Sequence, residues 1–212
     1  MNIDKYKAII FDLDGVIVST DMCHYKAWKH LADDERIYFD AKINERLRGV
    51  SRMESLEIIL EHTNKSYTDA EKIEMTEKKN RYYIELINQI DKSAILNGSI
   101  DFVNKAKANG IKVAIGSSSK NTKLILEKIE CDNMFDAVAD GNDIKNSKPD
   151  PEVFFKAAEK LGIEPCDCLV VEDADAGVEA ALNAGMEILA VGSAAANNKA
   201  TYAFKDLKEA LE

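Results

Sequence analysis

The stretch that decides the fold is KAIIFDLDG, residues 7–15. Its first half is a continuous apolar run, which is typical of a strand covered on both faces of a parallel sheet. The run ends in two aspartates, Asp12 and Asp14, with only Leu13 between them. Packing gives no reason to place two carboxylates where a buried strand reaches the surface. We therefore interpret this pair as a candidate site for chemistry.

Similar short apolar runs recur along the chain. They are IKVAIGS (111–117), DAVAD (136–140), CLVVED (168–173) and MEILAVG (186–192). Helical patterns lie between them; in one, Asp150 can cap the helix, Pro151 suits its first position and Gly162 its end. The alternation predicts an α/β protein with a Rossmann-like, doubly wound parallel sheet and helices on both faces. Residues 193–201 are expected to form a mobile loop.

Residues 18–94 contain no strand-like run. Four helices are expected there, at MCHYKAWKHLAD, DAKINERLRG, RMESLEIILEHT and DAEKIEMTEKKNRYYIELINQ. Two pairs have the spacing of a capping box, Ser51 with Glu54 and Thr68 with Glu71. The sequence therefore predicts a small α-helical cap domain, residues 18–94, inserted into an α/β core formed by residues 1–17 and 95–212.

Composition excludes several classes of protein. The 212 residues are 46% apolar and 31% charged, which is ordinary for a soluble globular chain, and the formal net charge is −10. This acidic balance argues against a nucleic-acid surface. No apolar run approaches the roughly 18 residues that span a bilayer, and no targeting signal is visible. We expect a cytoplasmic protein that binds neither nucleic acid nor membrane, a monomer, with its four cysteines as buried thiols.

Candidate functional residues follow the predicted strands. In open parallel sheets, ligands bind outside the carboxyl ends of the strands. Acids, hydroxyls, an amide and lysines fall at those ends, namely Asp12, Asp14, Ser117, Ser119, Lys120, Asn121, Lys148, Glu172 and Asp173. Four carboxylates facing one cavity would repel one another, and a bound hard dication would offset this repulsion. Because the ligands are all oxygens, one Mg²⁺ ion is favoured. Such an ion leaves coordination places open for a phosphate, with Lys148 and the Ser117 hydroxyl beside it.

Four motifs resemble those of the haloacid dehalogenase-like phosphotransferases, in order and at suitable spacing. They are FDLDGV (11–16), GSSSKN (116–121), SKPDP (147–151) and VVEDADAG (170–177). The resemblance implies that Asp12 is the nucleophile that forms an aspartyl-phosphate and that Asp14 is the general acid/base. It also implies a Mg²⁺ site made by Asp12, the Asp14 carbonyl, Asp173 and Glu172, the last directly or through water.

The inserted region resembles, more narrowly, the β-phosphoglucomutase branch of that family. The matching segments are HYKAW (24–28), LRGVSRMESL (47–56) and KKN (78–80). The branch implies a sugar phosphate as substrate: β-D-glucose 1-phosphate becomes glucose 6-phosphate through a β-glucose 1,6-bisphosphate, which requires a second phosphate pocket. Arg52 suits that pocket, because Ser51 is the expected N-cap and a helix N-terminus favours an anion. Further candidates for sugar or phosphate contacts are Arg48, Gly49, Val50, Ser51, Lys79, Ser119, Lys120, Asn121 and Trp28.

Several alternatives stay open. His24 is expected to couple closure of the cap to Asp14, although a histidine in such a place is commonly a core or helix-capping residue. Trp28 suits the core of the cap better than a substrate contact. Two other functions remain: a sugar-phosphate phosphatase, in which water replaces the sugar as phosphoryl acceptor, and a non-catalytic protein that binds sugar phosphates.

Overall fold

A computed structural model describes residues 1–47 and 50–212 of the chain. The described chain divides into two compact units, which we call the core unit (residues 1–19 and 91–212) and the insertion unit (residues 20–90). The roles of catalytic core and cap that the sequence assigns to these regions stay predictions.

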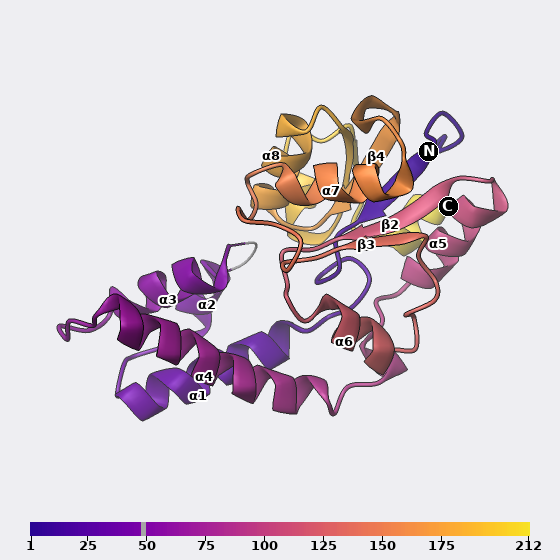
Figure 1. Cartoon of the computed structure of the whole chain (residues 1–212). Helices are drawn as coiled ribbons and strands as arrows, with labels where there is room; N and C mark the ends of the chain where they lie inside the picture. The colour runs from indigo at the N-terminus through magenta and orange to yellow at the C-terminus, as the bar shows by residue number, and fades with distance from the viewer. Residues whose placement is uncertain (48–49) are drawn as a thin grey trace. The chain divides into compact units, whose positions relative to one another are not determined.

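The core unit is built on one parallel sheet. Its strands, within the described residues, lie in the order β3-β2-β1-β4-β5-β6 (Figure 1). Their bounds are β1 (Ala8–Phe11), β2 (Lys112–Gly116), β3 (Ala137–Ala139), β4 (Cys168–Glu172), β5 (Glu187–Ala190) and β6 (Tyr202–Ala203). The strand order reverses between β1 and β4, because β2 and β3 lie on one side of β1 and the later strands on the other. Ligands of open α/β sheets bind at such a switch point.

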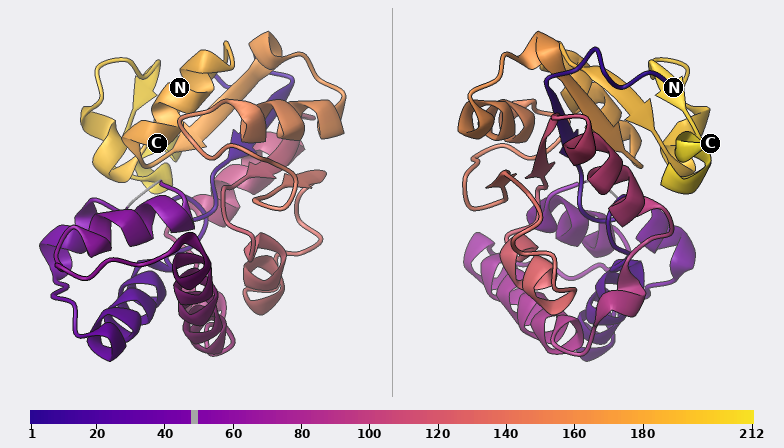
Figure 2. Two further views of the ribbon diagram at one scale, coloured as in Figure 1. Left: turned by 60° about the vertical axis from the view of Figure 1, so that its left-hand side comes forward. Right: turned by 90° about the vertical axis from the view of Figure 1, so that its right-hand side faces the viewer.

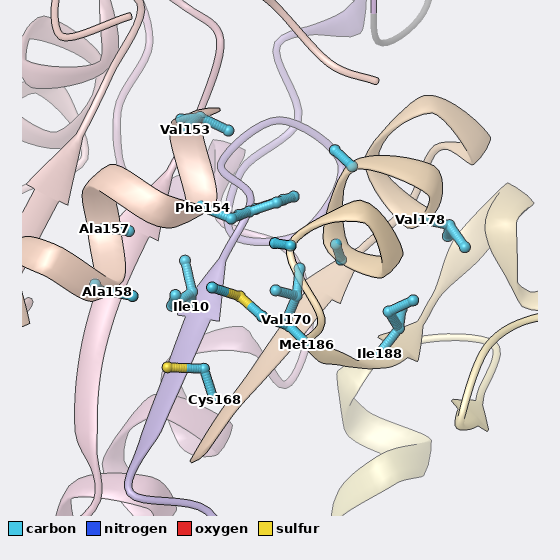
Figure 3. Close-up of a cluster of buried hydrophobic side chains, with 14 of the residues drawn as sticks. Ile10, Val153, Phe154, Ala157, Ala158, Cys168, Val170, Val178, Met186 and Ile188 are labelled. Carbon is cyan, nitrogen blue, oxygen red and sulfur yellow. The ribbon is translucent and has the colours of Figure 1, made fainter. Parts of the chain in front are cut away.

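Helices cover both faces of this sheet. The helices of the core unit, within the described residues, are α5 (Ser99–Ala108), α6 (Thr122–Lys128), α7 (Glu152–Leu161), α8 (Asp175–Asn183) and α9 (Leu207–Leu211), with short 3₁₀ helices η1 (Lys92–Ala94), η2 (Pro165–Asp167) and η3 (Gly192–Ala196). Of these, α5, α7 and α8 pack directly against strands. On one face, Ile10 belongs to a buried cluster with Phe154 of α7 and Val178 of α8 (Figure 3). Phe11 points to the other face and meets Phe102 of α5 edge to face, with ring centroids 6.1 Å apart. The predicted doubly wound α/β fold is confirmed.

Two local predictions in the core unit are wrong, and one stretch has more regular structure than expected. The stretch 193–201, which was expected to be a mobile loop, contains most of η3 and leads into β6, a two-residue edge strand too short to show any periodicity. Pro151 is the N-cap of α7 rather than its first residue, and Asp150 Oδ1 accepts the N–H of Glu152 at 3.0 Å. The four cysteines are not all buried, since Cys166 is exposed.

The insertion unit is helical (Figure 2). Its helices, in the described residues, are α1 (Asp21–Glu35), α2 (Ala41–Glu45), α3 (Arg52–Leu60) and α4 (Asp69–Ile87). Helix α4 packs against α1 and α3, and Trp28, Leu56 and Ile59 lie in the shared hydrophobic core. Thr68 and Glu71 form the reciprocal capping box that the sequence predicts. Across the described chain, no helix has both the length and the apolar composition needed to cross a membrane.

The chain of the core unit is paired where it flanks the insertion. The N–H of Ser19 donates to the carbonyl of Ala94 at 2.9 Å, and Val18 and Ile95 form an antiparallel bridge. These contacts hold the two flanking segments side by side.

Candidate active site

The loop after β1 carries the two aspartates that open the sequence analysis. Asp12 is 7% exposed, and its N–H donates to the carbonyl of Val171 on β4 at 2.9 Å, which extends the pairing across the switch point. Asp14 is half-buried. The chain turns at Gly15, whose φ is +86°, and a Cβ there would lie 2.1 Å from Oδ2 of Asp173. The turn therefore needs glycine, and the Asp173 carboxylate lies directly against it.

Lys148 is the buried cation of this site. Its Nζ lies 2.5 Å from Oδ1 of Asp12 and also forms an ion pair with Glu172, and the residue is 3% exposed. Burial alone would lower the pKa of Lys148, but the two carboxylates outweigh this effect and hold the pKa above its usual value. Lys148 is therefore charged at neutral pH.

Glu172 is fixed by contacts to both carboxylate oxygens. Oε2 accepts the N–H groups of Asp173 at 2.9 Å and Ala174 at 3.0 Å, while Oε1 faces Lys148. A Cβ on Gly177, in the first turn of α8, would lie 1.8 Å from Oε1, so glycine is what allows this helix to begin so close. Both oxygens of Glu172 therefore have protein partners, and its predicted role as a metal ligand, directly or through water, stays a prediction.

Three carboxylates meet at the ends of β1 and β4. One oxygen from each of Asp12, Glu172 and Asp173 lies within 4.8 Å of the others. Burial raises the pKa of Asp12 well above its usual value; Lys148 opposes this shift, and Glu172 and Asp173 add to it. An excess of negative charge on carboxylate oxygens suits a hard dication, so the residues present fit the predicted Mg²⁺. The Asp14 carbonyl stays a predicted ligand.

The loop after β2 is shaped by its own serines. Ser117 is 3% exposed, and its Oγ accepts the N–H of Ser119 at 3.2 Å, while Ser119 Oγ accepts the N–H of Asn121 at 3.2 Å. Asn121 is the N-cap residue of α6, which the sequence analysis did not predict. Lys120 is exposed. The parallel register of β1 and β2 places this loop beside the β1 loop, and its role in phosphate binding stays a prediction.

A second loop supports the first, and sequence reasoning missed it. The N–H of Gly141 donates to the carbonyl of Ser119 at 3.1 Å, and Asn142 Nδ2 donates to the carbonyl of Lys120 at 3.0 Å. Asp140 begins this loop with 1% exposure, and its Oδ1 accepts the N–H of Asn142 at 2.8 Å. The signal that identified Asp12, an acid directly after a strand, is also present at Asp140.

The insertion unit holds a buried lysine among aromatic rings. Lys79 is 2% exposed; its Nζ lies 3.0 Å from Nδ1 of His24, 4.8 Å from the Trp28 ring centroid and 4.6 Å from that of Tyr83. A lysine ammonium can only donate, so His24 accepts at Nδ1 as a neutral ring. Trp28 is 2% exposed and belongs to the hydrophobic core of the unit, which favours its structural role over a substrate contact.

Arg52 begins helix α3, as the sequence predicts. Ser51 is the N-cap, and its side chain accepts the N–H of Glu54 at 3.2 Å. Val50, Ser51 and Arg52 are all half-buried, and burial lowers the pKa of Arg52. Two other proposed contacts, Arg48 and Gly49, lie outside the described residues. Roles in substrate binding for all of these stay predictions.

His24 should make the stability of the protein depend on pH. Burial, Lys79 and Arg52 together lower the pKa of His24 well below its usual value. The unfolded chain, with a histidine pKa of about 6.5, then binds more protons than the folded chain over the interval between the two values. The free energy of unfolding should therefore fall as pH drops below about 6.5, and His24→Gln should remove that part of the fall.

This prediction is checked by urea unfolding of the wild type and His24→Gln at a series of pH values from about 5 to about 8. Replacement of the exposed His62 by glutamine is the matched control and should leave the pH dependence unchanged. A stability difference between wild type and His24→Gln that is constant with pH would contradict the prediction.

Comparison with known proteins agrees with this geometry. The model of the haloacid dehalogenase-like hydrolases matches residues 6–185. The chain belongs to that family. Its matched span includes every core-unit residue proposed for the site, from Asp12 to Asp173.

Two proteins resemble most of this chain closely. The β-phosphoglucomutase of Bacillus subtilis is 43% identical over 88% of this chain and 83% of its own. The crystal structure of β-phosphoglucomutase from Clostridium difficile has a TM-score of 0.91 and 41% identity, covering 98% of this chain and 93% of the other. A more distant member, the phosphorylated carbohydrates phosphatase of Thermotoga maritima, is 30% identical over 85% of this chain and 82% of its own. The resemblance inferred from the motifs is therefore confirmed.

Proposed function

We propose that the protein interconverts β-D-glucose 1-phosphate and glucose 6-phosphate through an aspartyl-phosphate and a β-glucose 1,6-bisphosphate, with one Mg²⁺ ion. The observation that carries this proposal is the group formed at the switch point by the buried Asp12, Lys148 and Glu172 together with the half-buried Asp173. A nucleophilic carboxylate beside a fixed ammonium is suited to phosphoryl transfer. The high identity to two proteins named β-phosphoglucomutase supports a sugar phosphate as the substrate.

Asp12 and Lys148 perform the transfer itself. A carboxylate oxygen of Asp12 attacks phosphorus, its new O–P bond forms, and the P–O bond to the sugar breaks. Lys148, which already lies 2.5 Å from Asp12 Oδ1, offsets the negative charge on the phosphoryl oxygens. The Ser117 hydroxyl donates a hydrogen bond to the same group. A Mg²⁺ ion held by Asp12 and Asp173 would supply further positive charge at this point.

Asp14 moves the proton. It gives a proton to the departing sugar oxygen when Asp12 is phosphorylated. In the reverse direction it removes a proton from the sugar hydroxyl that attacks the phosphoaspartate. Because the intermediate bisphosphate must present each of its phosphates to Asp12 in turn, the other phosphate needs a binding site of its own.

The insertion unit is proposed to bind that other phosphate and to exclude water. Arg52 stands at the first residue of a nine-residue helix, where backbone N–H groups favour an anion. Lys79 and His24 add polar groups in the same unit. Closure of this unit over the core unit would favour a sugar hydroxyl over water as the acceptor from phosphoaspartate.

An assay that follows both products tests the proposal. The protein is mixed with Mg²⁺, β-glucose 1-phosphate and a trace of β-glucose 1,6-bisphosphate, and glucose 6-phosphate and inorganic phosphate are measured together. Glucose 6-phosphate as the main product is expected. Inorganic phosphate as the main product would show the phosphatase instead, an activity named for the Thermotoga relative. Binding of sugar phosphate with neither product would show a non-catalytic binding protein.

Arg52→Ala should separate isomerisation from phosphoryl transfer. Loss of charge-assisted hydrogen bonds to the second phosphate should lower kcat/KM for isomerisation by about 10- to 100-fold. Hydrolysis of a small aryl phosphate, which has no second phosphate, should stay within about twofold of the wild type.

The matched control is Arg81→Ala, which removes an exposed arginine from helix α4 of the same unit. It should change neither activity. Equal losses of both activities in Arg52→Ala would contradict the assigned role.

A further inference from the structure

The segment after β5 is bonded to the loop that carries Asp173. Ser193 Oγ donates to the carbonyl of Asp173 at 2.7 Å, and the N–H of Ala194 donates to the same carbonyl at 3.0 Å. Gly192, directly before these two donors, has a φ of +57° and turns the chain there. Nearby, Asn197 Nδ2 donates to Oδ1 of Asp175 at 2.8 Å. The region expected from its sequence to be a mobile loop is thus attached to the proposed metal site.

We propose that Ser193 is a positioning residue for the metal-binding loop: its hydroxyl fixes the peptide of Asp173 and thereby strengthens Mg²⁺ binding. The inference deepens the proposed function and rests on its metal site. Ser193 touches neither the ion nor the substrate in this role, and it acts only through the backbone of Asp173.

The need for such a contact follows from charge repulsion at the site. Asp12, Glu172 and Asp173 place oxygens within 4.8 Å of one another, and Lys148 balances only part of their charge. Without an ion, repulsion among the carboxylates favours movement of Asp173 away from Asp12 and Glu172, and a loop without supporting contacts would allow this movement. Two hydrogen bonds to one carbonyl oppose this movement. The Asp173 carboxylate is then already ordered in the folded protein, so Mg²⁺ binding does not have to offset the cost of ordering it.

The surroundings of Asp173 make small backbone movements important. A Cβ on Gly15 would lie 2.1 Å from Asp173 Oδ2, so the Asp173 carboxylate lies directly against the turn at Gly15. On the other side Glu172 accepts the N–H of Asp173, which fixes one end of the peptide. The bond from Ser193 fixes the carbonyl end of the same residue.

Ser193 suits a clean test because its side chain is exposed and packs little. In Ser193→Ala the bond from the Ala194 N–H remains, so the loop loses one of its two contacts. Loss of one neutral hydrogen bond should raise the dissociation constant for Mg²⁺ by about three- to tenfold. Isothermal titration of the full chain with MgCl₂, after removal of metal by EDTA and dialysis, measures this constant directly.

Two further variants keep the interpretation specific. Ser193→Thr retains the hydroxyl and should restore the wild-type constant to within about twofold. Asn197→Ala removes one hydrogen bond between the same two segments, but the bond ends on Asp175, so Mg²⁺ affinity should stay unchanged. In EDTA, Ser193→Ala and Asn197→Ala should unfold at similar urea concentrations.

The outcomes distinguish the inference from the metal site beneath it. If the wild type binds Mg²⁺ and Ser193→Ala binds it equally well, Ser193 has no positioning role, whatever its effect on stability. Equal weakening in Asn197→Ala would show general loosening of the segment and would also overturn the inference. If the wild type itself gives no binding heat with Mg²⁺, the proposed metal site fails, and the role of Ser193 fails with it.

Discussion

Asp12→Asn should abolish both the phosphoenzyme and all turnover, with a loss of at least about 10⁴-fold in kcat. An amide oxygen cannot form the acyl phosphate that the mechanism requires, and Glu172 cannot replace Asp12 without losing its own partners, because it is bound by Lys148 and by two backbone N–H groups. The fold should survive, because burial already disfavours the charge on Asp12 and Lys148 keeps Glu172 as a partner. The measurement is the assay above together with intact-protein mass spectrometry after brief exposure to the bisphosphate.

The matched control is Asp175→Asn, which removes an exposed acid two residues beyond Asp173. It should leave both the phosphorylated mass and the turnover close to wild type. A phosphoryl group still carried by Asp12→Asn would show that another residue is the nucleophile.

Lys148→Ala should lower both stability and activity, and added Mg²⁺ should restore part of the stability. Removing one partner of a buried ion pair leaves carboxylates without compensation, which typically costs about 3–5 kcal/mol in the free energy of unfolding. Loss of the fixed positive charge should lower kcat by about 10²- to 10³-fold. Urea unfolding in EDTA and in saturating MgCl₂ measures the first effect, and a larger gain from Mg²⁺ than in the wild type is expected.

Lys145→Ala is the matched control for this experiment. It removes an exposed lysine three positions earlier in the same connection between β3 and α7, and it should change neither quantity measurably. If Lys148→Ala had the stability of the wild type in EDTA, the buried ion pairs of Lys148 would not have the importance assigned to them.

The core fold could be predicted from sequence because its strands and its helices each carry a clear signal. Each long strand is a continuous apolar run, and a glycine ends several of the helices between them, as Gly162 and Gly185 do with φ of +68° and +71°. The same strand ends identified Asp12, Lys148, Glu172 and Asp173 as neighbours, because parallel strands bring their carboxyl ends to one edge. The pairing of Lys148 with both Asp12 and Glu172 needed the structure.

Contacts made across the chain could not be predicted in this way. Strand β6 has two residues, and its pairing with β5 depends on register rather than on composition. The polar segment with Ser193 looked mobile, because small and polar residues favour a loop when nothing else is known. In the structure Ser193 donates a hydrogen bond to the carbonyl of Asp173, twenty residues away, and no local sequence pattern indicates such a contact. Asp140 could have been predicted, because it is an acid directly after β3, as Asp12 is after β1.

The pairing of Val18 with Ile95 at the root of the insertion bears on how such proteins diversify. The core chain is already joined there, so everything between these residues is topologically one large loop. The entropy of closing a flexible loop grows slowly, by about 0.6 kcal/mol for each doubling of its length. Evolution can therefore lengthen, shorten or exchange the inserted helices with little effect on the folding of the sheet. A core that transfers phosphoryl groups can therefore acquire new acceptor molecules through changes in an inserted domain that is joined to it only near the Val18–Ile95 bridge.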